Sequence, residues 1–499
     1  MHFTVVDIII VIVYLGGIAL FGALSGGKQR SARDYFLSES AVPWWAVTLA
    51  IVATETSALT FLSIPGIAYA ADLSFLQLAI GYIIGRILVA RLLLPRYFQG
   101  ELSTAYAYLG TRFGMRMRRT ASTVFMTTRV FADGVRLYTT AIPLALLLKG
   151  FGVLPGTSDS TVYLVAISVL SLLTLVYVYF GGVRAVIWTD VIQFFIYIGG
   201  AMLALYYLQD LLAGRMAEGM ASLTQAGKLR IFSSGFDLGW QGFFTKPYTT
   251  LASIVGGMFL SMASHGTDQL IIQRVLTTGD LRKSQRAMIV SGIIVFAQFA
   301  MFLVLGSLLW IFYQGQPHAA NEVFATFLLE QLPSGVTGLI VAGILAAAMS
   351  TLSGSISALG SATMMDIILP LRRTPMSDAV VLRWSRLFSM GWCLVLIASA
   401  SLFIQTPKAV VELALSIASY TYGGLLGVFL LGVLFRAVGE TAAIIGFAVA
   451  IATMACVILL TPVAWTWYVL IGSSACIAAA LLASVFLPSP PIAEHHGIH

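Results

Sequence analysis

The chain has 499 residues, of which 59% are hydrophobic and only 10% are charged. Together with a mean hydropathy of +0.93, this composition excludes the ordinary soluble globular classes. The formal charge of +7 indicates membrane topology rather than nucleic-acid binding, because the basic residues cluster between apolar stretches. All three cysteines fall inside apolar runs, which argues against a disulfide framework or a thiolate metal site.

Apolar stretches of about 20 residues, the length that crosses a bilayer, recur along the whole sequence. They predict an all-α polytopic membrane protein with about 13 transmembrane helices. Lys and Arg concentrate in alternate connections, so we expect an outside N-terminus and a cytoplasmic C-terminus in the cell (plasma or inner) membrane. The expected spans are residues 4–24, 43–71, 74–95, 120–148, 160–181, 186–209, 248–276, 288–314, 336–369, 384–404, 410–435, 441–461 and 466–487.

Two of these spans carry interruptions at similar places. The second contains the stretch ATETS at 53–57, with four consecutive polar residues. Successive helical side chains point about 100° apart, so no single protected face can hide all four. The seventh span carries Gly256-Gly257 and then the stretch SHG at 264–266. Paired interrupted helices in two halves of a chain indicate a transporter with inverted repeats and a binding site near the midplane.

The interrupted spans divide the chain into two five-helix repeats with peripheral segments. The expected organisation is an N-terminal peripheral helix and inner loop at 1–42, a first repeat at 43–209, an external loop at 210–247, a second repeat at 248–435, and two peripheral helices with a tail at 436–499.

The ninth span offers oxygen ligands for a small cation. Ala347, Ser350 and Thr351 are spaced i, i+3 and i+4, so they share one helical face. Na⁺ is a hard cation that prefers oxygen, and two hydroxyls with three carbonyls, including those freed at Ala53 and Thr56, would supply about five ligands. Small residues spaced four apart in the same span equally indicate close helix packing. Spacing alone leaves both interpretations open.

Four segments are similar to a known family. The segments GGVRAVIWTDVIQFFIYIGGA and AAAMSTLSGSISALGSATMMDI resemble the two signature regions of the sodium/solute symporter family. The stretches SALTFLSIPGIAY and HGTDQLIIQRVL resemble its first and sixth core helices. The resemblance covers nearly the whole chain and implies a LeuT-like core of ten helices with broken first and sixth members, extra peripheral helices, and alternating access driven by sodium.

The resemblance also implies positions for the ions. The family's principal sodium site maps onto the backbone of Ala53 and Thr56 and onto Ala347, Ser350 and Thr351. A second sodium site, found in some members, uses an aspartate and two serines.

For that second site, Asp190 and Ser353 match, but Gly354 stands where the other serine is expected. A second ion is therefore in doubt. Asp190 has an alternative role, which is to cap its helix or pair with basic residues of the inner loops.

Four charged residues lie within the predicted spans and sum to zero, namely Glu55, Arg86, Asp133 and Arg136. A carboxylate near the bilayer centre costs about 2.5–3.5 kcal/mol, so Glu55 should be paired or functional. It either forms an ion pair with Arg86 or Arg136, accepts hydrogen bonds from hydroxyl or amino groups of the solute, or takes part in proton coupling.

The remaining candidate solute contacts lie near the interruptions. Buried polar groups seek partners, so the histidine could instead fix the helix together with its neighbours Asp268 and Gln269. The tyrosines could equally serve packing or interface anchoring. These candidates are Ser57, Thr60, Gln77, Ser261, Ser264, His265, Tyr420 and Tyr422.

The patterns together favour sodium-coupled symport of a small polar organic solute, either a sugar or polyol or an amino-acid-like molecule. The alternative solute is an organic anion such as a carboxylate or sialic acid. A channel would favour rings of like residues from identical subunits, and an enzyme would need a base and nucleophile that the sequence does not indicate. A transporter-like sensor is a further rival. We expect no catalytic residues, Na⁺ as coupling ion, the solute and the lipid bilayer as partners, and neither nucleic acid nor an obligatory protein partner.

Overall fold

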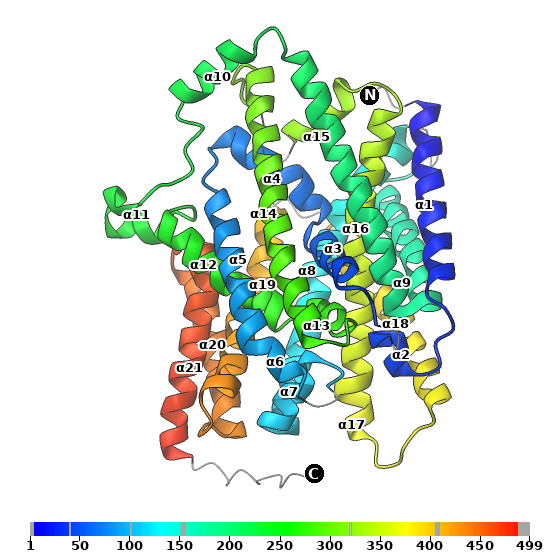
Figure 1. The fold of residues 1–499 in the computed structure, drawn as a ribbon, viewed down its shortest axis with the longest axis vertical. Helices are drawn as coiled ribbons and strands as arrows, with labels where there is room; N and C mark the ends of the chain where they lie inside the picture. Colours follow the sequence, from blue (N-terminus) through cyan, green and yellow to red (C-terminus); the bar gives the residue numbers. More distant parts are fainter. Residues whose placement is uncertain are drawn as a thin grey trace.

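A computed structural model describes residues 4–38, 41–99, 102–150, 156–318, 320, 322–404 and 410–487. The predicted tail at 488–499 lies outside these residues. Within them the regular structure is helical, and most of the long helices run side by side in one bundle (Figure 1).

The helices in the first half of the chain are α1 (Val5–Ser25), α2 (Ala32–Leu37), α3 (Trp44–Glu55), α4 (Ala58–Ala70), α5 (Leu76–Leu88), η1 (Val89–Leu93), α6 (Leu94–Tyr97), α7 (Ala105–Arg112), α8 (Met115–Gly150), α9 (Asp159–Leu211), α10 (Met216–Gln225), η2 (Phe236–Leu238) and α11 (Gly239–Thr245). Those in the second half are α12 (Thr250–Gly266), α13 (Gln269–Leu276), α14 (Leu281–Phe312), α15 (Val323–Glu330), α16 (Val336–Ser361), η3 (Ala362–Ile368), α17 (Leu369–Leu371), α18 (Asp378–Ser401), α19 (Val410–Leu434), α20 (Glu440–Leu460), η4 (Trp465–Trp467) and α21 (Tyr468–Phe486).

Eight of the described helical stretches are long and apolar enough to cross a membrane, and the bent pair α3–α4 makes a ninth. One of the eight, α9, is 53 residues long and contains two of the predicted spans. At a rise of about 1.5 Å per residue, a straight helix of this length would be far longer than a bilayer is thick. The total of about 13 spans stays a prediction.

Gly182 divides α9 into two arms that fold back on each other. Its φ of 59° and ψ of −162° are not helical. Tyr177 and Thr189, on either side of it, both lie against Gly22 of α1: a Cβ there would come within 2.5 Å of the first and 2.8 Å of the second. On a straight helix these residues would be about 18 Å apart. The chain therefore reverses at Gly182, between the fifth and sixth predicted spans.

Both predicted helix breaks are present. The axes of α3 and α4 differ by 63°, and the helix is interrupted at Thr56 and Ser57. The second break separates α12 from α13 at Thr267 and Asp268, one residue beyond the SHG stretch.

Gly256-Gly257, by contrast, stays helical within α12. A Cβ at Gly257 would lie 2.6 Å from the Leu78 carbonyl oxygen of α5, and one at Gly256 would lie 2.3 Å from the Thr466 carbonyl oxygen. The pair therefore permits close helix approach rather than a break, in the manner of small residues at membrane helix interfaces.

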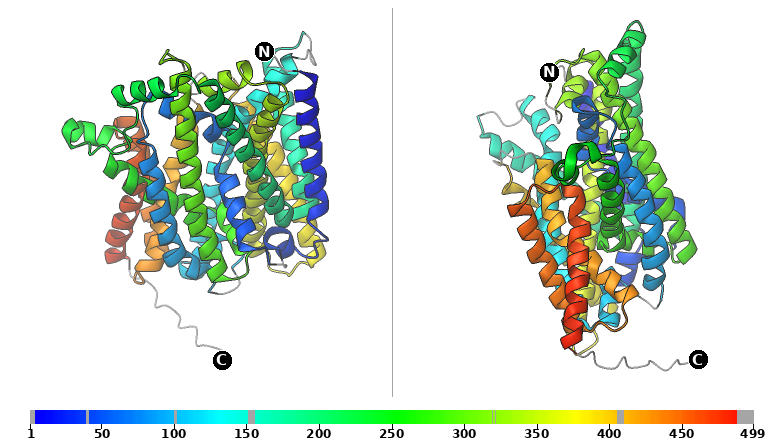
Figure 2. Two further views of the ribbon diagram at one scale, coloured as in Figure 1. Left: turned by 45° about the horizontal axis from the view of Figure 1, so that its top comes forward. Right: turned by 90° about the vertical axis from the view of Figure 1, so that its left-hand side faces the viewer.

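The second helix of each predicted repeat packs against the broken helix of the other. Helix α5 packs along α12, and α14 packs along α3 and α4. The pair α20–α21 packs on α19, whereas α1 packs on α9 and α16. Figure 2 shows that α1 and this pair lie at opposite edges of the bundle. The residue limits of the repeats stay a prediction.

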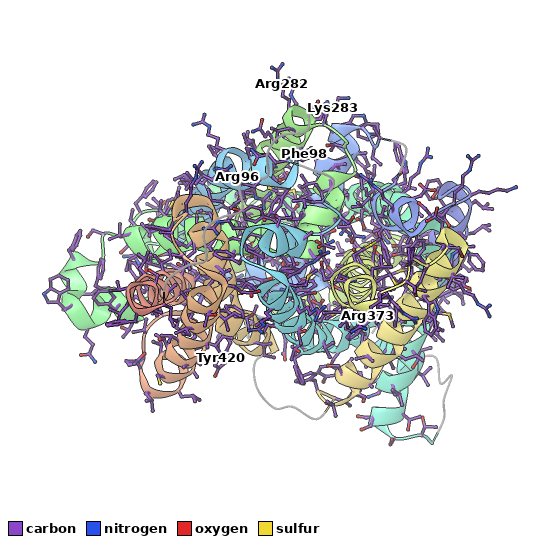
Figure 3. The ribbon with its side chains drawn as sticks, turned by 90° about the horizontal axis from the view of Figure 1, so that it is seen from below. Arg96, Phe98, Arg282, Lys283, Arg373 and Tyr420 are labelled. Carbon is purple, nitrogen blue, oxygen red and sulfur yellow. The ribbon has the colours of Figure 1, made fainter. Side chains whose placement is uncertain are left out.

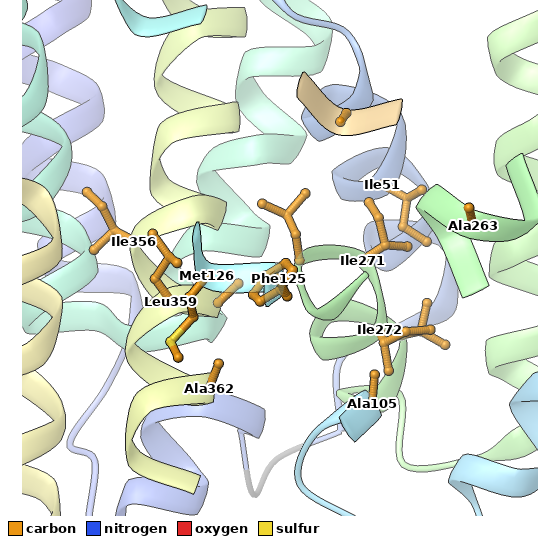
Figure 4. Packing of buried hydrophobic residues seen from close by; sticks show 14 of the residues in the cluster. Ile51, Ala105, Phe125, Met126, Ala263, Ile271, Ile272, Ile356, Leu359 and Ala362 are labelled. Carbon is orange, nitrogen blue, oxygen red and sulfur yellow. The ribbon is translucent and has the colours of Figure 1, made fainter. Parts of the chain in front are cut away.

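Apolar side chains hold the broken helices in the centre of the bundle. Ile51 of α3, Phe125 of α8, Ile271 of α13 and Ile356 of α16 belong to one buried cluster (Figure 4). Because these residues come from both predicted repeats, the cluster fixes the two breaks relative to each other.

Basic side chains gather at one end of the bundle. Figure 3 shows Arg96, Arg282, Lys283 and Arg373 on the face that lies at the bottom of Figure 1. This face is the one that the sequence predicts to be cytoplasmic. The orientation itself stays a prediction.

The fold-back at Gly182 is open to a direct test. Gly182→Ala places a side chain in a backbone region that only glycine adopts readily, at a cost of about 1–3 kcal/mol. The added Cβ would also lie 2.7 Å from the Tyr35 carbonyl oxygen. We expect a lower melting temperature for the purified protein in detergent. Gly199→Ala is the matched control, because no atom lies within 4 Å of its added Cβ; equal melting of the two variants would contradict the role of Gly182.

Candidate functional site

The break between α3 and α4 exposes the two backbone carbonyls that the sequence suggests as ion ligands. In a continuous helix the Ser57 amide would donate to the Ala53 carbonyl, but here it donates to the Glu55 carbonyl at 3.1 Å. The Thr60 amide would donate to the Thr56 carbonyl, but it donates instead to the Ser57 hydroxyl at 3.3 Å. The carbonyls of Ala53 and Thr56 thus lose their helical donors, as happens at helix ends.

The ninth-span hydroxyls of α16 face this break. The Thr351 hydroxyl lies 3.2 Å from the Thr54 carbonyl and 3.2 Å from the Ala347 carbonyl. The Ser350 hydroxyl donates to Asp190 Oδ1 at 2.6 Å. All of these side chains are buried. The structure therefore brings α16, which carries Ala347 and both hydroxyls, against the break that carries Ala53 and Thr56. Carbonyl and hydroxyl oxygens form a donor set suited to a hard cation.

Close packing explains other small residues of the same helix. A Cβ at Gly343 would lie 3.1 Å from Tyr197 Cα of α9, so α16 and α9 could not approach as they do with a larger residue there. Close packing therefore accounts for Gly343, whereas ion binding at Ser350 and Thr351 stays a prediction.

A cavity of about 230 Å³ lies beside the break. It is lined by residues of both broken helices together with α5, α8, α14 and α19. Among the predicted solute contacts, those that line it are Glu55, Ser57, Thr60, Ser264, His265 and Tyr422.

Three predicted contacts, Gln77, Ser261 and Tyr420, are not among the described residues that line this cavity. Gln77 donates to backbone carbonyls at 3.2 and 3.3 Å. Ser261 donates to the Tyr82 carbonyl at 3.1 Å. These bonds involve α5 and its surroundings, so the side chains hold helices rather than face the cavity.

Glu55 projects from the end of α3 and forms an ion pair with Arg86 of α5. The carboxylate is 16% exposed, whereas Arg86 is fully buried and also donates to the Ser291 hydroxyl at 2.6 Å. His265 Nε2 lies 3.4 Å from the same carboxylate oxygen, Oε2 of Glu55. Its Nδ1 lies 2.8 Å from the Ser264 hydroxyl. Glu55 is thus both part of an ion pair and accessible from the cavity.

A second group of charges is centred on α8, whose Arg129 and Arg136 also line the cavity. Arg136 Nη1 and Arg129 Nη1 lie 3.3 and 3.2 Å from the same oxygen of Asp133. Arg129 also forms an ion pair with Asp268 in the second break. The Tyr422 hydroxyl donates to Asp268 at 2.9 Å. Because Asp268 also caps α13, these bonds tie α8, α13 and α19 together.

The sequence did not single out Arg129 or Asp268 as ion-pair partners. The available signal was that Arg129 stands four residues before Asp133 on a predicted helix, which places both on one face. With these two residues the cavity charges form two balanced groups, Glu55 with Arg86, and Asp133 and Asp268 with Arg129 and Arg136.

The sequence model of the sodium:solute symporter family matches residues 35–450. The chain belongs to this family. It is 28% identical over 491 residues to the sodium/sialic acid symporter SiaT of Proteus mirabilis, covering 95% of this chain and 94% of the relative. It is also 28% identical over 484 residues to the sodium/sialic acid symporter NanT of Aliivibrio fischeri, covering 94% and 91%.

A solved structure shows the same architecture. The substrate-bound, outward-open state of a Na⁺-coupled sialic acid symporter matches with a TM-score of 0.85 and 25% identity, over 98% of this chain and 99% of that chain. The match confirms the predicted all-α, LeuT-like fold with two broken helices. Family membership makes the protein a multi-pass secondary active transporter, not an enzyme, with Na⁺ as its coupling ion.

The sodium site gives a direct prediction for this symporter. Ser350→Ala combined with Thr351→Ala removes both hydroxyl ligands from the predicted ion site while leaving the carbonyls of the break in place. We expect solute uptake into proteoliposomes to lose its sodium dependence, with membrane insertion intact. Thr337→Ala is the matched control, because its hydroxyl lies within 3.4 Å of the Leu328 carbonyl at the far end of α16. Unchanged sodium dependence in the double variant would contradict the site.

Proposed function

We propose that this symporter imports, together with Na⁺, a small solute that carries a carboxylate as well as hydroxyl or amino groups. The observation that carries the proposal is that one cavity is lined by Arg136 of α8, by Glu55 at the end of α3 and by His265 of α12. A solute with one anionic end and several hydrogen-bond donors complements these groups.

Arg136 is the group best placed to bind a carboxylate. Its side chain is 25% exposed and lies 3.3 Å from Asp133. That carboxylate is also shared with Arg129 at 3.2 Å and with the Ser355 hydroxyl at 2.5 Å. A guanidinium group has five N–H donors in a planar fork that matches a carboxylate. Asp133 therefore accepts only some of the hydrogen bonds that Arg136 can donate.

The part of the cavity lined by Glu55 suits hydrogen-bond donors of the solute. Glu55 is held by Arg86 on its buried side and is accessible on the other. An ionised carboxylate accepts hydrogen bonds through about four lone-pair positions. Ser57, the N-cap of α4, and Thr60 within α4 line the same cavity, so they add hydroxyl groups near Glu55.

Aromatic side chains form much of the remaining wall, and these are Phe75, Tyr82, Tyr248, Phe299, Tyr422 and Trp465. Apolar lining with a few placed polar groups is typical of small-molecule sites. Both sialic acid symporters to which the chain is similar act on an acidic sugar, which belongs to the proposed solute class. A neutral polyol would leave the N–H groups of Arg136 that Asp133 does not occupy without a carboxylate to bind.

The geometry suggests how ion and solute couple. The two carbonyls proposed to bind Na⁺, at Ala53 and Thr56, flank Glu55 in the sequence. Binding of the ion would therefore fix the backbone that presents Glu55 to the solute. A ligand shifts a conformational equilibrium only through different affinities for the two states. In this proposal the outward-open state, in which the break is ordered, binds Na⁺ more tightly.

Arg136 distinguishes the proposed solutes from neutral ones. Arg136→Gln should raise the KM for carboxylate solutes about tenfold or more, because loss of a charged hydrogen bond costs about 1.5–3 kcal/mol. A thermal-shift screen with and without NaCl would first identify solutes that stabilise the protein only with sodium. Arg116→Gln, an exposed position on the same helix, is the control. Stabilisation by neutral polyols alone, unaffected by Arg136→Gln, would overturn the proposed solute class.

We expect Glu55 to bind the solute in addition to forming its ion pair with Arg86. Glu55→Gln alone leaves Arg86 buried without its partner, so we expect a loss of stability of about 3–5 kcal/mol. Glu55→Gln combined with Arg86→Gln removes both charges and should recover much of that loss. We expect this double variant to keep its sodium-induced thermal shift and to lose the solute-induced one. Full retention of the solute-induced shift would show that Glu55 is only structural.

A further inference from the structure

His265 carries a ring nitrogen whose hydrogen bonding the ion pairs of the cavity leave incomplete. The residue lies in the last turn of α12 and lines the cavity, and its side chain is only 3% exposed. Nδ1 lies 2.8 Å from the Ser264 hydroxyl. Nε2, in contrast, is buried and has no hydrogen-bond partner within the part of the chain that the structure describes. Buried polar atoms almost always have a partner, so this nitrogen needs a physical explanation.

The Ser264 hydroxyl decides which ring nitrogen carries the hydrogen. This hydroxyl has a single hydrogen, which it donates to the Leu260 carbonyl at 2.9 Å. The Ser264 oxygen can therefore only accept from His265, so Nδ1 is the protonated nitrogen. In a neutral imidazole the other nitrogen is an acceptor. Nε2 therefore presents a lone pair.

The lone pair of Nε2 lies beside a second acceptor. Glu55 Oε2 is 3.4 Å away, which is longer than the N···O distance of about 2.7–3.2 Å in an N–H···O bond. The same oxygen already accepts a hydrogen bond from Arg86. Two neighbouring acceptors are satisfied only when a donor lies near both. None of the described residues donates to Nε2, so the donor has to come from the cavity.

The charges around His265 favour its neutral form. Each acid near the cavity is already paired with an arginine, and the groups concerned are Glu55, Asp133 and Asp268 with Arg86, Arg129 and Arg136. A protonated imidazole would therefore add a positive charge that has no acid of its own. Such a charge is costly at membrane depth. A neutral ring with its hydrogen on Nδ1 avoids this cost.

We propose that His265 is a solute-binding residue that accepts, through Nε2, a hydrogen bond from a hydroxyl group held beside Glu55. The inference rests on the proposed function, because it assigns the hydrogen-bond donors of that solute to two adjacent acceptors. A hydroxyl suits this place better than an ammonium group, since the charges of the cavity are already balanced. Two neighbouring hydroxyls can donate one hydrogen to each acceptor. The site therefore favours polyhydroxy carboxylates over amino acids.

The first test locates the hydrogens directly and without any solute. Nitrogen NMR of protein isotope-labelled at histidine distinguishes protonated from unprotonated ring nitrogens, and comparison with His265→Gln assigns the signals. In lipid bilayers at neutral pH, we expect a hydrogen on Nδ1 and none on Nε2. A hydrogen on Nε2, with or without one on Nδ1, would overturn the proposal. Since no solute is present, this result does not depend on the proposed solute class.

The second test uses two polyhydroxy carboxylates as probes, sialic acid and D-gluconate. His265→Phe keeps a flat ring but removes the acceptor, so both probes should bind about tenfold more weakly. His265→Gln offers an amide oxygen as acceptor and should recover much of this loss. Both variants should keep the sodium-induced thermal shift, because His265 is not among the predicted ion ligands. Affinities measured by isothermal titration calorimetry check these expectations.

Controls separate this role from a structural one and from the proposed solute class. His318→Gln replaces a histidine that is not among the described residues lining the cavity, and it should leave both affinities unchanged. Equal affinities of the unmodified protein and folded His265→Phe would contradict the proposal, as would equal losses in His265→Phe and His265→Gln. Arg136→Gln tests the carboxylate end of the same probes, so failure of the solute class would appear there instead. If neither probe binds the unmodified protein, the NMR result decides.

Discussion

The structure depends on an interrupted helix that would be unstable on its own at membrane depth. Backbone carbonyls without helical donors are costly in lipid, so such a break persists only where protein groups or a watery cavity surround it. Here the Thr351 hydroxyl reaches the Thr54 carbonyl at 3.2 Å, and Gln298 donates to the Thr56 hydroxyl at 2.8 Å. The carbonyls of Ala53 and Thr56, beside these contacts, have no helical donor and are the groups proposed to bind Na⁺.

Two sets of buried charges lie near the first break, and each set holds equal numbers of acids and arginines. The group at the cavity holds three acids and three arginines, and Glu55 and Arg136 are its most accessible members. The pair of Asp190 and Arg274 lies behind the ion site and is fully buried. Balanced pairing is what makes so many charges tolerable within a membrane protein.

The two helix breaks supply different chemical groups to the ion and solute sites. The first break offers carbonyls and Glu55, whereas the second offers Asp268, which caps α13 and pairs with Arg129. Arg274 lies on α13, so the helix that begins at the second break carries the cation that neutralises Asp190. Through Ser350, this ion pair reaches the proposed sodium site. Movement of α13 would therefore change the surroundings of the ion site directly, because only one ion pair and one hydrogen bond separate the two.

The sequence by itself determined the helical membrane class, the first break, the shared face of Ala347, Ser350 and Thr351, and the presence of charges at depth. These features follow from polarity and spacing within single spans, which are local properties. Tertiary structure alone decided that Glu55 pairs with Arg86, that Asp190 pairs with Arg274, and that Gln77, Ser261 and Tyr420 do not line the cavity. An ion pair between residues 84 positions apart depends on which helices pack together, and a periodic pattern within one helix holds no information about its neighbours.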